Sequence, residues 1–149
     1  MLYKYSVSIL GTGFIGLCSA ACFAQKEIKV LASTHNEKKA KMINDGVAPF
    51  YEVGLQEIMD EIKTKKPELM QCLLDPVKAI TDTDISMITQ GTPMRADKSI
   101  DLSFIESTAR EIGEALKKKD KYQACQKGQG GNYVGRKKYS RSFCCSINN

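Results

Sequence analysis

Short apolar runs alternate with amphipathic segments along the first 120 residues. The runs at residues 5–10, 28–32, 69–74 and 85–89 predict strands, because each is short and bounded by turn residues. Apolar residues at helical spacing predict helices at residues 13–25, 36–46, 55–62, 76–80 and 102–119. Strands that alternate with helices predict an α/β fold, a doubly wound parallel sheet of about four strands with flanking helices.

Capping residues support the predicted helix ends. Asn36, Asp75 and Asp101 are each suited to the N-cap of the helix that follows, and Pro76 fits a first helical position. Gly46 fits the end of the second helix. The last helix is expected to bury the face formed by Phe104, Ile105, Ala109, Ile112 and Leu116.

A glycine-rich turn joins the first predicted strand to the first helix, with the sequence Gly11-Thr12-Gly13-Phe14-Ile15-Gly16. In G-x-G-x-x-G, the first glycine allows a tight turn, the second lets a phosphate approach the backbone, and the third lets helix and strand pack closely. Because a strand precedes it and a helix follows, the motif predicts a dinucleotide-binding loop of the Rossmann type, with an ordinary strand-to-helix turn as the alternative.

Composition changes this interpretation only at the C-terminus. The 149 residues, 42% hydrophobic and 26% charged, are enough for a folded domain. The net charge of +5 equals that of residues 124–149, which hold five basic residues and no acidic one. The rest of the chain is balanced, so no affinity for nucleic acid or a membrane surface is expected.

The same boundary divides the chain into a partial Rossmann-like domain at residues 1–123 and a basic tail at residues 124–149. The tail lacks an apolar run from residue 126 to 142, and we expect it to be poorly ordered. A nucleic-acid-binding arm at residues 135–139 is the alternative. We therefore expect the fourth strand to have an unpaired edge, open to association with another chain.

The cysteines and the N-terminus bear on location. Cys18, Cys22 and Cys72 are expected to be small buried residues of a cytoplasmic protein, and no cysteine or histidine spacing indicates a metal site. The single histidine, His35, is expected at the surface. Residues 5–25 carry no charge, so a signal peptide is the alternative, although three glycines interrupt the apolar stretch.

Four motifs in order give the chain a resemblance to a known family. The glycine loop is followed by Asn36-Glu37-Lys38-Lys39, by Pro49-Phe50-Tyr51-Glu52-Val53-Gly54-Leu55, and by Gly91-Thr92-Pro93 with Ser99-Ile100-Asp101-Leu102-Ser103-Phe104. Over residues 3–123, the chain resembles the N-terminal NAD-binding domain of the UDP-glucose/GDP-mannose dehydrogenase family. That family oxidises the C6 alcohol of a nucleotide sugar to a carboxylate with two NAD.

The resemblance implies roles for particular residues. Gly11, Thr12, Gly13, Phe14, Ile15 and Gly16 would hold the pyrophosphate of NAD, Lys39 would assist at the adenosine ribose, and Thr92 would approach the nicotinamide. Thr34 stands where the family has the acidic residue that binds the ribose diol. A hydroxyl cannot replace a carboxylate's paired hydrogen bonds, so weaker NAD binding and poorer rejection of NADP are expected. The Tyr51-Glu52 pair lies near the substrate in the family, and a role in the turn is the alternative.

Two departures limit the expected activity. The resemblance stops at about Gln123, where composition, charge and periodicity change together, as is typical of a shifted reading frame. The family's nucleophilic cysteine belongs to a C-terminal domain that has no counterpart here. We expect an NAD-binding fragment of a UDP-glucose-type 6-dehydrogenase without turnover. A free-standing dinucleotide-binding module that pairs with another chain is the alternative; the matches at residues 51–52 and 92–93 argue against an unrelated nicotinamide or flavin enzyme.

Overall fold

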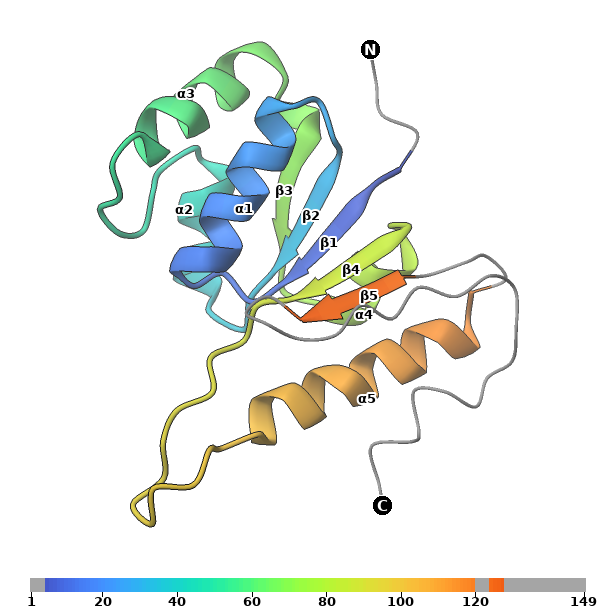
Figure 1. Cartoon of the computed structure of the whole chain (residues 1–149). Coiled ribbons are helices and arrows are strands. Elements are labelled where there is room, and N and C mark those ends of the chain that lie inside the picture. Colours follow the sequence, from blue (N-terminus) through green and yellow to red (C-terminus); the bar gives the residue numbers. More distant parts are fainter. Residues whose placement is uncertain (1–4, 120–123, 128–149) are drawn as a thin grey trace.

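The computed structural model describes residues 5–119 and 124–127, which form a parallel sheet with helices on both faces (Figure 1). Its five strands lie in the order β3-β2-β1-β4-β5. They are β1 (Val7–Leu10), β2 (Val30–Ser33), β3 (Met70–Leu73), β4 (Ile85–Ile88) and β5 (Ala124–Lys127). The order reverses between β1 and β4, which is the Rossmann arrangement. The predicted fold class is confirmed.

Helices cover the two faces separately. On one face lie α1 (Phe14–Gln25), α2 (Glu37–Asn44) and α3 (Leu55–Lys65), and on the other lie α4 (Pro76–Thr81) and α5 (Ser103–Lys117) (Figure 1). The helix expected at residues 55–62 extends to Lys65 as α3, and a 3-10 turn at Pro67–Leu69 leads from it into β3. The described residues contain no helix long and apolar enough to cross a membrane.

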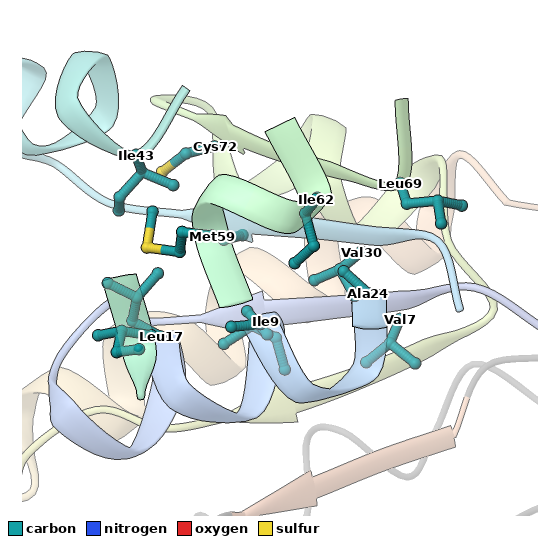
Figure 2. Close-up of a cluster of buried hydrophobic side chains, with 14 of the residues drawn as sticks. Val7, Ile9, Leu17, Ala24, Val30, Ile43, Met59, Ile62, Leu69 and Cys72 are labelled. Carbon is teal, nitrogen blue, oxygen red and sulfur yellow. The ribbon is translucent and has the colours of Figure 1, made fainter. Parts of the chain in front are cut away.

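The larger core lies between the sheet and the helices α1 and α3. Figure 2 shows Leu17 and Ala24 of α1 beside Ile9 and Val30 of the sheet, with Met59 and Ile62 of α3 above them. Apart from Leu17, the buried residues of α1 are small: Gly16, Ala20, Ala21 and Ala24. Small side chains allow α1 to pack closely on β1 and β2, which holds the start of α1 against the carboxyl end of β1.

The second core corrects the predicted face of α5. Ile112 and Ala115 pack with Leu10 and Ile80, and Thr108 is also buried, whereas Phe104 is 54% exposed. Ile105, Ala109 and Leu116 are half-buried, so the predicted face of α5 is wrong only at Phe104. The reason is that α5 packs on α4, itself a short helix over the sheet, so little apolar surface is available at the start of α5.

The prediction that no strand follows the last helix is wrong. Residues 124–127 form β5, which pairs with β4 in parallel register from Ile85 opposite Ala124 to Ile88 opposite Lys127. The backbone supplies these hydrogen bonds whatever the side chains are, so strand formation did not require the apolar run that the sequence lacks. The edge of β4 expected to be unpaired is covered. The predicted nucleic-acid arm lies outside the described residues.

The opposite edge of the sheet is covered by a side chain. The amide of Asn44, at the end of α2, donates to the carbonyl of Cys72 at 2.9 Å and accepts the N–H of Cys72 at 2.7 Å. An amide side chain that makes both bonds imitates a neighbouring strand. Asn44 therefore blocks the β3 edge against a further strand at Cys72, and β5 already occupies the edge of β4.

Most of the predicted caps are confirmed. The side chain of Asn36 accepts the N–H of Lys39 at 3.0 Å, and Asp75 accepts the N–H of Val77 at 2.9 Å. Gly46 has a φ of +82°, as the end of α2 requires. Asp101 is not the N-cap of α5, which is Leu102, although its carboxylate accepts the N–H of Ser103 at 2.9 Å.

The expected burial of the cysteines is confirmed only in part. Cys72 is buried, Cys18 is half-buried and Cys22 is exposed on α1. All three are free thiols. Cys22 lies between the buried residues Ala21 and Ala24 but on the exposed side of α1.

Candidate functional site

The glycine loop lies at the carboxyl end of β1, at the centre of the sheet. Gly11 has a φ of +112°, a conformation that other residues rarely adopt, and its N–H donates to Ser33 of β2 at 3.2 Å. This turn directs the chain out of β1 and across the sheet edge into α1. The glycine predicted to make the tight turn is therefore the one that makes it.

The other two glycines differ sharply in their surroundings. A Cβ atom at Gly16 would lie 2.0 Å from the carbonyl oxygen of Gly11, whereas a Cβ at Gly13 would meet no atom within 4 Å. Gly16 is thus fixed by close packing of the helix on the loop. Gly13 faces open space, which leaves its backbone accessible to a ligand.

The start of α1 is electrostatically suited to an anion. Gly13 is the N-cap and provides no side-chain hydrogen bond, and the first turn contains no acidic residue. The backbone N–H groups of a helix's first turn lack partners within the helix and carry a partial positive charge. Phosphate is the common ligand of such a helix start at the end of a central strand.

Thr89 holds the glycine loop in place, and the sequence analysis did not single it out. Its hydroxyl lies 2.7 Å from the carbonyl oxygen of Gly11, and its N–H donates to Leu10 at 3.0 Å. The same hydroxyl would lie 2.6 Å from a Cβ at Gly16. Its position in the sequence could have indicated this role, because Thr89 is a polar residue directly after β4. Such residues lie at the carboxyl edge of the sheet, where the chain order reverses between β1 and β4.

Thr34 follows β2 at the same edge. Its N–H donates to Leu73 of β3 at 3.1 Å, and its hydroxyl accepts the N–H of Asn36 at 3.3 Å. The side chain is half-buried. These bonds fix a neutral hydroxyl where the chain passes from β2 to α2.

Lys39 connects α2 to the glycine loop. Its ammonium donates to the carbonyl oxygen of Thr12 at 2.9 Å and lies 5.7 Å from the centre of the Phe50 ring. The Phe50 ring in turn packs on Phe14, with ring centres 4.3 Å apart. The structure therefore joins Lys39 to the glycine loop and places Thr34 at the same edge of the sheet.

Thr92 lies on the segment that leaves β4 at this edge. It is half-buried and follows Gln90, whose side chain lies 3.3 Å from the Cβ position of Gly11. From here the chain extends away from the sheet as a loop and returns to α5 (Figure 1). Thr92 thus lies at the same edge of the sheet as the glycine loop, and the structure gives it no contact with Lys39 or Thr34.

The segment 47–54 borders the site on the α1 side. A concavity of about 390 Å³ is lined by Ala48, Phe50, Tyr51, Glu52, Val53, Gly54, Gln56 and Glu57. The carbonyl of Glu52 accepts the N–H of Leu55 at 3.1 Å, so Glu52 begins the turn that leads into α3, and Tyr51 lies before that turn. Tyr51 is 87% exposed and rests on no other element.

Two titratable groups near the site have shifted pKa values. Burial raises the pKa of the Cys18 thiol, and the nearby Glu52 carboxylate raises it further. Burial also raises the pKa of Glu111, which the charge of His35 partly offsets. His35 is exposed, as expected, and the described residues contain no group of three possible metal ligands.

Comparison with known proteins agrees with this geometry. The family model for the UDP-glucose/GDP-mannose dehydrogenase family, NAD binding domain, matches residues 5–122. A UDP-glucose 6-dehydrogenase of Bacillus subtilis (strain 168) is 34% identical over 110 residues, covering 74% of this chain and 23% of the relative. A GDP-mannose 6-dehydrogenase of Pseudomonas syringae pv. syringae is 36% identical over 114 residues, covering 76% and 25%.

Solved structures give the same result. A ternary complex of GDP-mannose dehydrogenase from Pseudomonas aeruginosa aligns with a TM-score of 0.77 and 30% identity, over 81% of this chain and 27% of that one. A UDP-glucose dehydrogenase from Pyrobaculum islandicum aligns with a TM-score of 0.79 and 26% identity, over 84% and 28%. The chain spans about a quarter of the length of the curated relatives it matches.

Proposed function

Because the chain belongs to the UDP-glucose/GDP-mannose dehydrogenase family, whose NAD-binding domain it carries, we propose that it is the NAD-binding part of a nucleotide-sugar 6-dehydrogenase. The observation that carries the proposal is the contrast between two glycines. Gly16 is closed against the loop and Gly13 is open to solvent. That is the arrangement a pyrophosphate requires, because it needs both a rigid loop and an approachable backbone.

The residues predicted from the sequence have these roles in the proposal. The backbone of Gly11, Thr12, Gly13, Phe14, Ile15 and Gly16 holds the pyrophosphate at the start of α1. Thr34 and Lys39 lie toward the adenosine ribose, and Thr92 toward the nicotinamide. When bound, NAD supplies the hydride acceptor, and the chain's own residues bind and orient it.

We further propose that the domain at residues 1–123 of the sequence-based division binds its cofactor without turnover of a sugar. The chain spans only about a quarter of the length of its relatives, so a nucleotide sugar as the substrate of the whole protein is itself a proposal. Cys18 has a raised pKa, and burial raises that of Cys72 to about 11. Neither is a ready thiolate at neutral pH, so neither is suited to be a nucleophile.

The three free thiols also support a reducing location, and we propose the cytoplasm. As a second candidate function, the chain is a binding module for a separate partner. That candidate is favoured by Met94 and Ile100, which are exposed on the loop between β4 and α5.

Titration with NADH tests the proposal. We expect saturable binding of NADH to the full chain, followed by nucleotide fluorescence, and no NADH formation when NAD is mixed with UDP-glucose or GDP-mannose. Absence of binding by fluorescence and by calorimetry would contradict the cofactor role. Formation of NADH from either sugar nucleotide would contradict the proposed lack of turnover and leave the cofactor role in place.

A further inference from the structure

The position after β2 is where a Rossmann fold distinguishes its two dinucleotides. An acidic residue there accepts hydrogen bonds from the ribose 2′-hydroxyl of NAD, while a nearby cation accommodates the 2′-phosphate of NADP. In this chain the position is Thr34, held by its bonds to Leu73 and Asn36. A threonine hydroxyl adds no negative charge that would repel a phosphate.

Two carboxylates, Glu37 and Asp75, follow β2 and β3 at this edge of the sheet. Asp75 begins α4, and its Oδ1 accepts the N–H groups of Val77 at 2.9 Å and Lys78 at 3.2 Å. Glu37 lies in the first turn of α2, is exposed, and is followed directly by Lys38 and Lys39. The stretch from residue 34 to 41 therefore has a net positive charge.

Lys39 places that charge in the site rather than in solvent. Its ammonium bonds to Thr12 in the glycine loop, so it lies between the loop and the start of α2. Thr12 takes one of the three N–H donors of the ammonium, and the other donors are available to a ligand. The Phe50 ring under Lys39 limits its movement.

We propose that this site binds NADP as well as NAD, with Thr34 admitting the 2′-phosphate and Lys38 and Lys39 holding it. The inference rests on the proposed cofactor role and concerns only which dinucleotide the site takes. Two lysines attract the 2′-phosphate dianion of NADP, whereas the neutral 2′-hydroxyl of NAD is not attracted by their charge. The NAD ribose, in turn, finds one neutral hydrogen bond where a carboxylate would give charge-assisted ones.

Paired titrations of the full chain with NADH and NADPH test this inference by nucleotide fluorescence. We expect dissociation constants within about tenfold of each other at physiological salt. Thr34→Asp should weaken NADPH binding by about 10- to 100-fold, since it sets a carboxylate against the phosphate, while NADH binding is unchanged or tighter. Thr34→Ser keeps the hydroxyl and should leave the ratio near that of the original chain.

A charge control separates local contact from overall charge. Lys38→Ala should weaken NADPH binding several-fold more than NADH binding. Lys29→Ala removes the same charge before β2, on an exposed residue about 16 Å along the strand direction from Thr34, well beyond the Debye length. It should leave both constants unchanged.

The outcomes separate the two proposals. NADH binding with NADPH weaker by about 100-fold or more would overturn the inference and leave the NAD role intact. Binding of neither nucleotide would overturn the proposed function itself. Equal losses from Lys38→Ala and Lys29→Ala would show attraction by net charge, and would also overturn the inference.

Discussion

At the scale of single residues, the loop depends on contacts that only some of its glycines make. Gly16 lies against the Gly11 carbonyl, and the Thr89 hydroxyl bonds to that same carbonyl. Gly13, three residues earlier, makes no such contact. One motif therefore contains one glycine needed for packing and one free to serve a ligand, and substitution separates these roles.

Gly16→Ala is expected to destabilise the chain by about 3 kcal/mol, because the added methyl would overlap backbone and must displace α1 from the loop. Gly13→Ala is expected to cost about 1 kcal/mol or less, because its φ of −71° suits alanine and the space is open. It should nevertheless weaken NADH binding about tenfold or more, since the methyl occupies the approach of the phosphate.

Chemical denaturation and NADH titration of both variants check this pair. Equal destabilisation by the two substitutions would show that Gly13 is also needed for packing. Unaltered NADH binding in a folded Gly13→Ala variant would show that the phosphate does not approach there.

At the scale of elements, α2 has two functions at its two ends. Its first turn follows Thr34 and supplies Lys39 to the glycine loop. Its last residue, Asn44, pairs with the backbone of β3. The helix thus spans from the candidate cofactor site to the β3 edge of the sheet.

Asn44→Ala is expected to destabilise the chain by about 1–2 kcal/mol, because two hydrogen bonds to Cys72 are lost and water replaces them only in part. It also opens the β3 edge to other strands, so faster aggregation at high temperature is expected. Asp45→Ala, the exposed neighbouring residue, is the matched control and should change stability by about 0.5 kcal/mol or less. Thermal melts that do not distinguish the two variants would contradict the role of Asn44.

At the scale of the whole molecule, apolar side chains are concentrated away from the core on one projecting segment. Met94 is 73% exposed and Ile100 is 61% exposed. The two are paired in an antiparallel bridge, so their side chains lie on one face of the loop. Leu102 and Phe104 continue the exposed apolar positions into α5. Such a grouping is typical of a surface that contacts another protein surface.

We therefore expect the chain to self-associate as its concentration rises. The double substitution Met94→Ser and Ile100→Ser should shift the equilibrium toward monomer, because it removes the paired apolar face without touching the sheet. Met42→Ser changes a less exposed methionine on α2 and serves as the control. Light scattering over a range of concentrations checks this, and a monomer at every concentration for the unmodified chain would contradict it.

Local sequence determined much of the fold. Apolar runs predicted four of the strands, and the glycine spacing predicted the turn at Gly11, because alternation, capping and positive φ depend on residues near one another in the chain. β5 was missed because its pairing with β4 comes from backbone hydrogen bonds, which any sequence can make. Of the predicted inward face of α5, only Phe104 was mispredicted, because the short α4 on which α5 packs does not cover the start of the helix.

The candidate site shows the same division. The sequence by itself determined the glycine loop, the hydroxyl at Thr34 and the lysines of α2, since these are matters of residue type and spacing. Only the tertiary structure decided that Lys39 reaches Thr12 and that Thr89 fixes Gly11. Those contacts join segments far apart in the chain, and the packing of parallel strands at a shared edge brings them together.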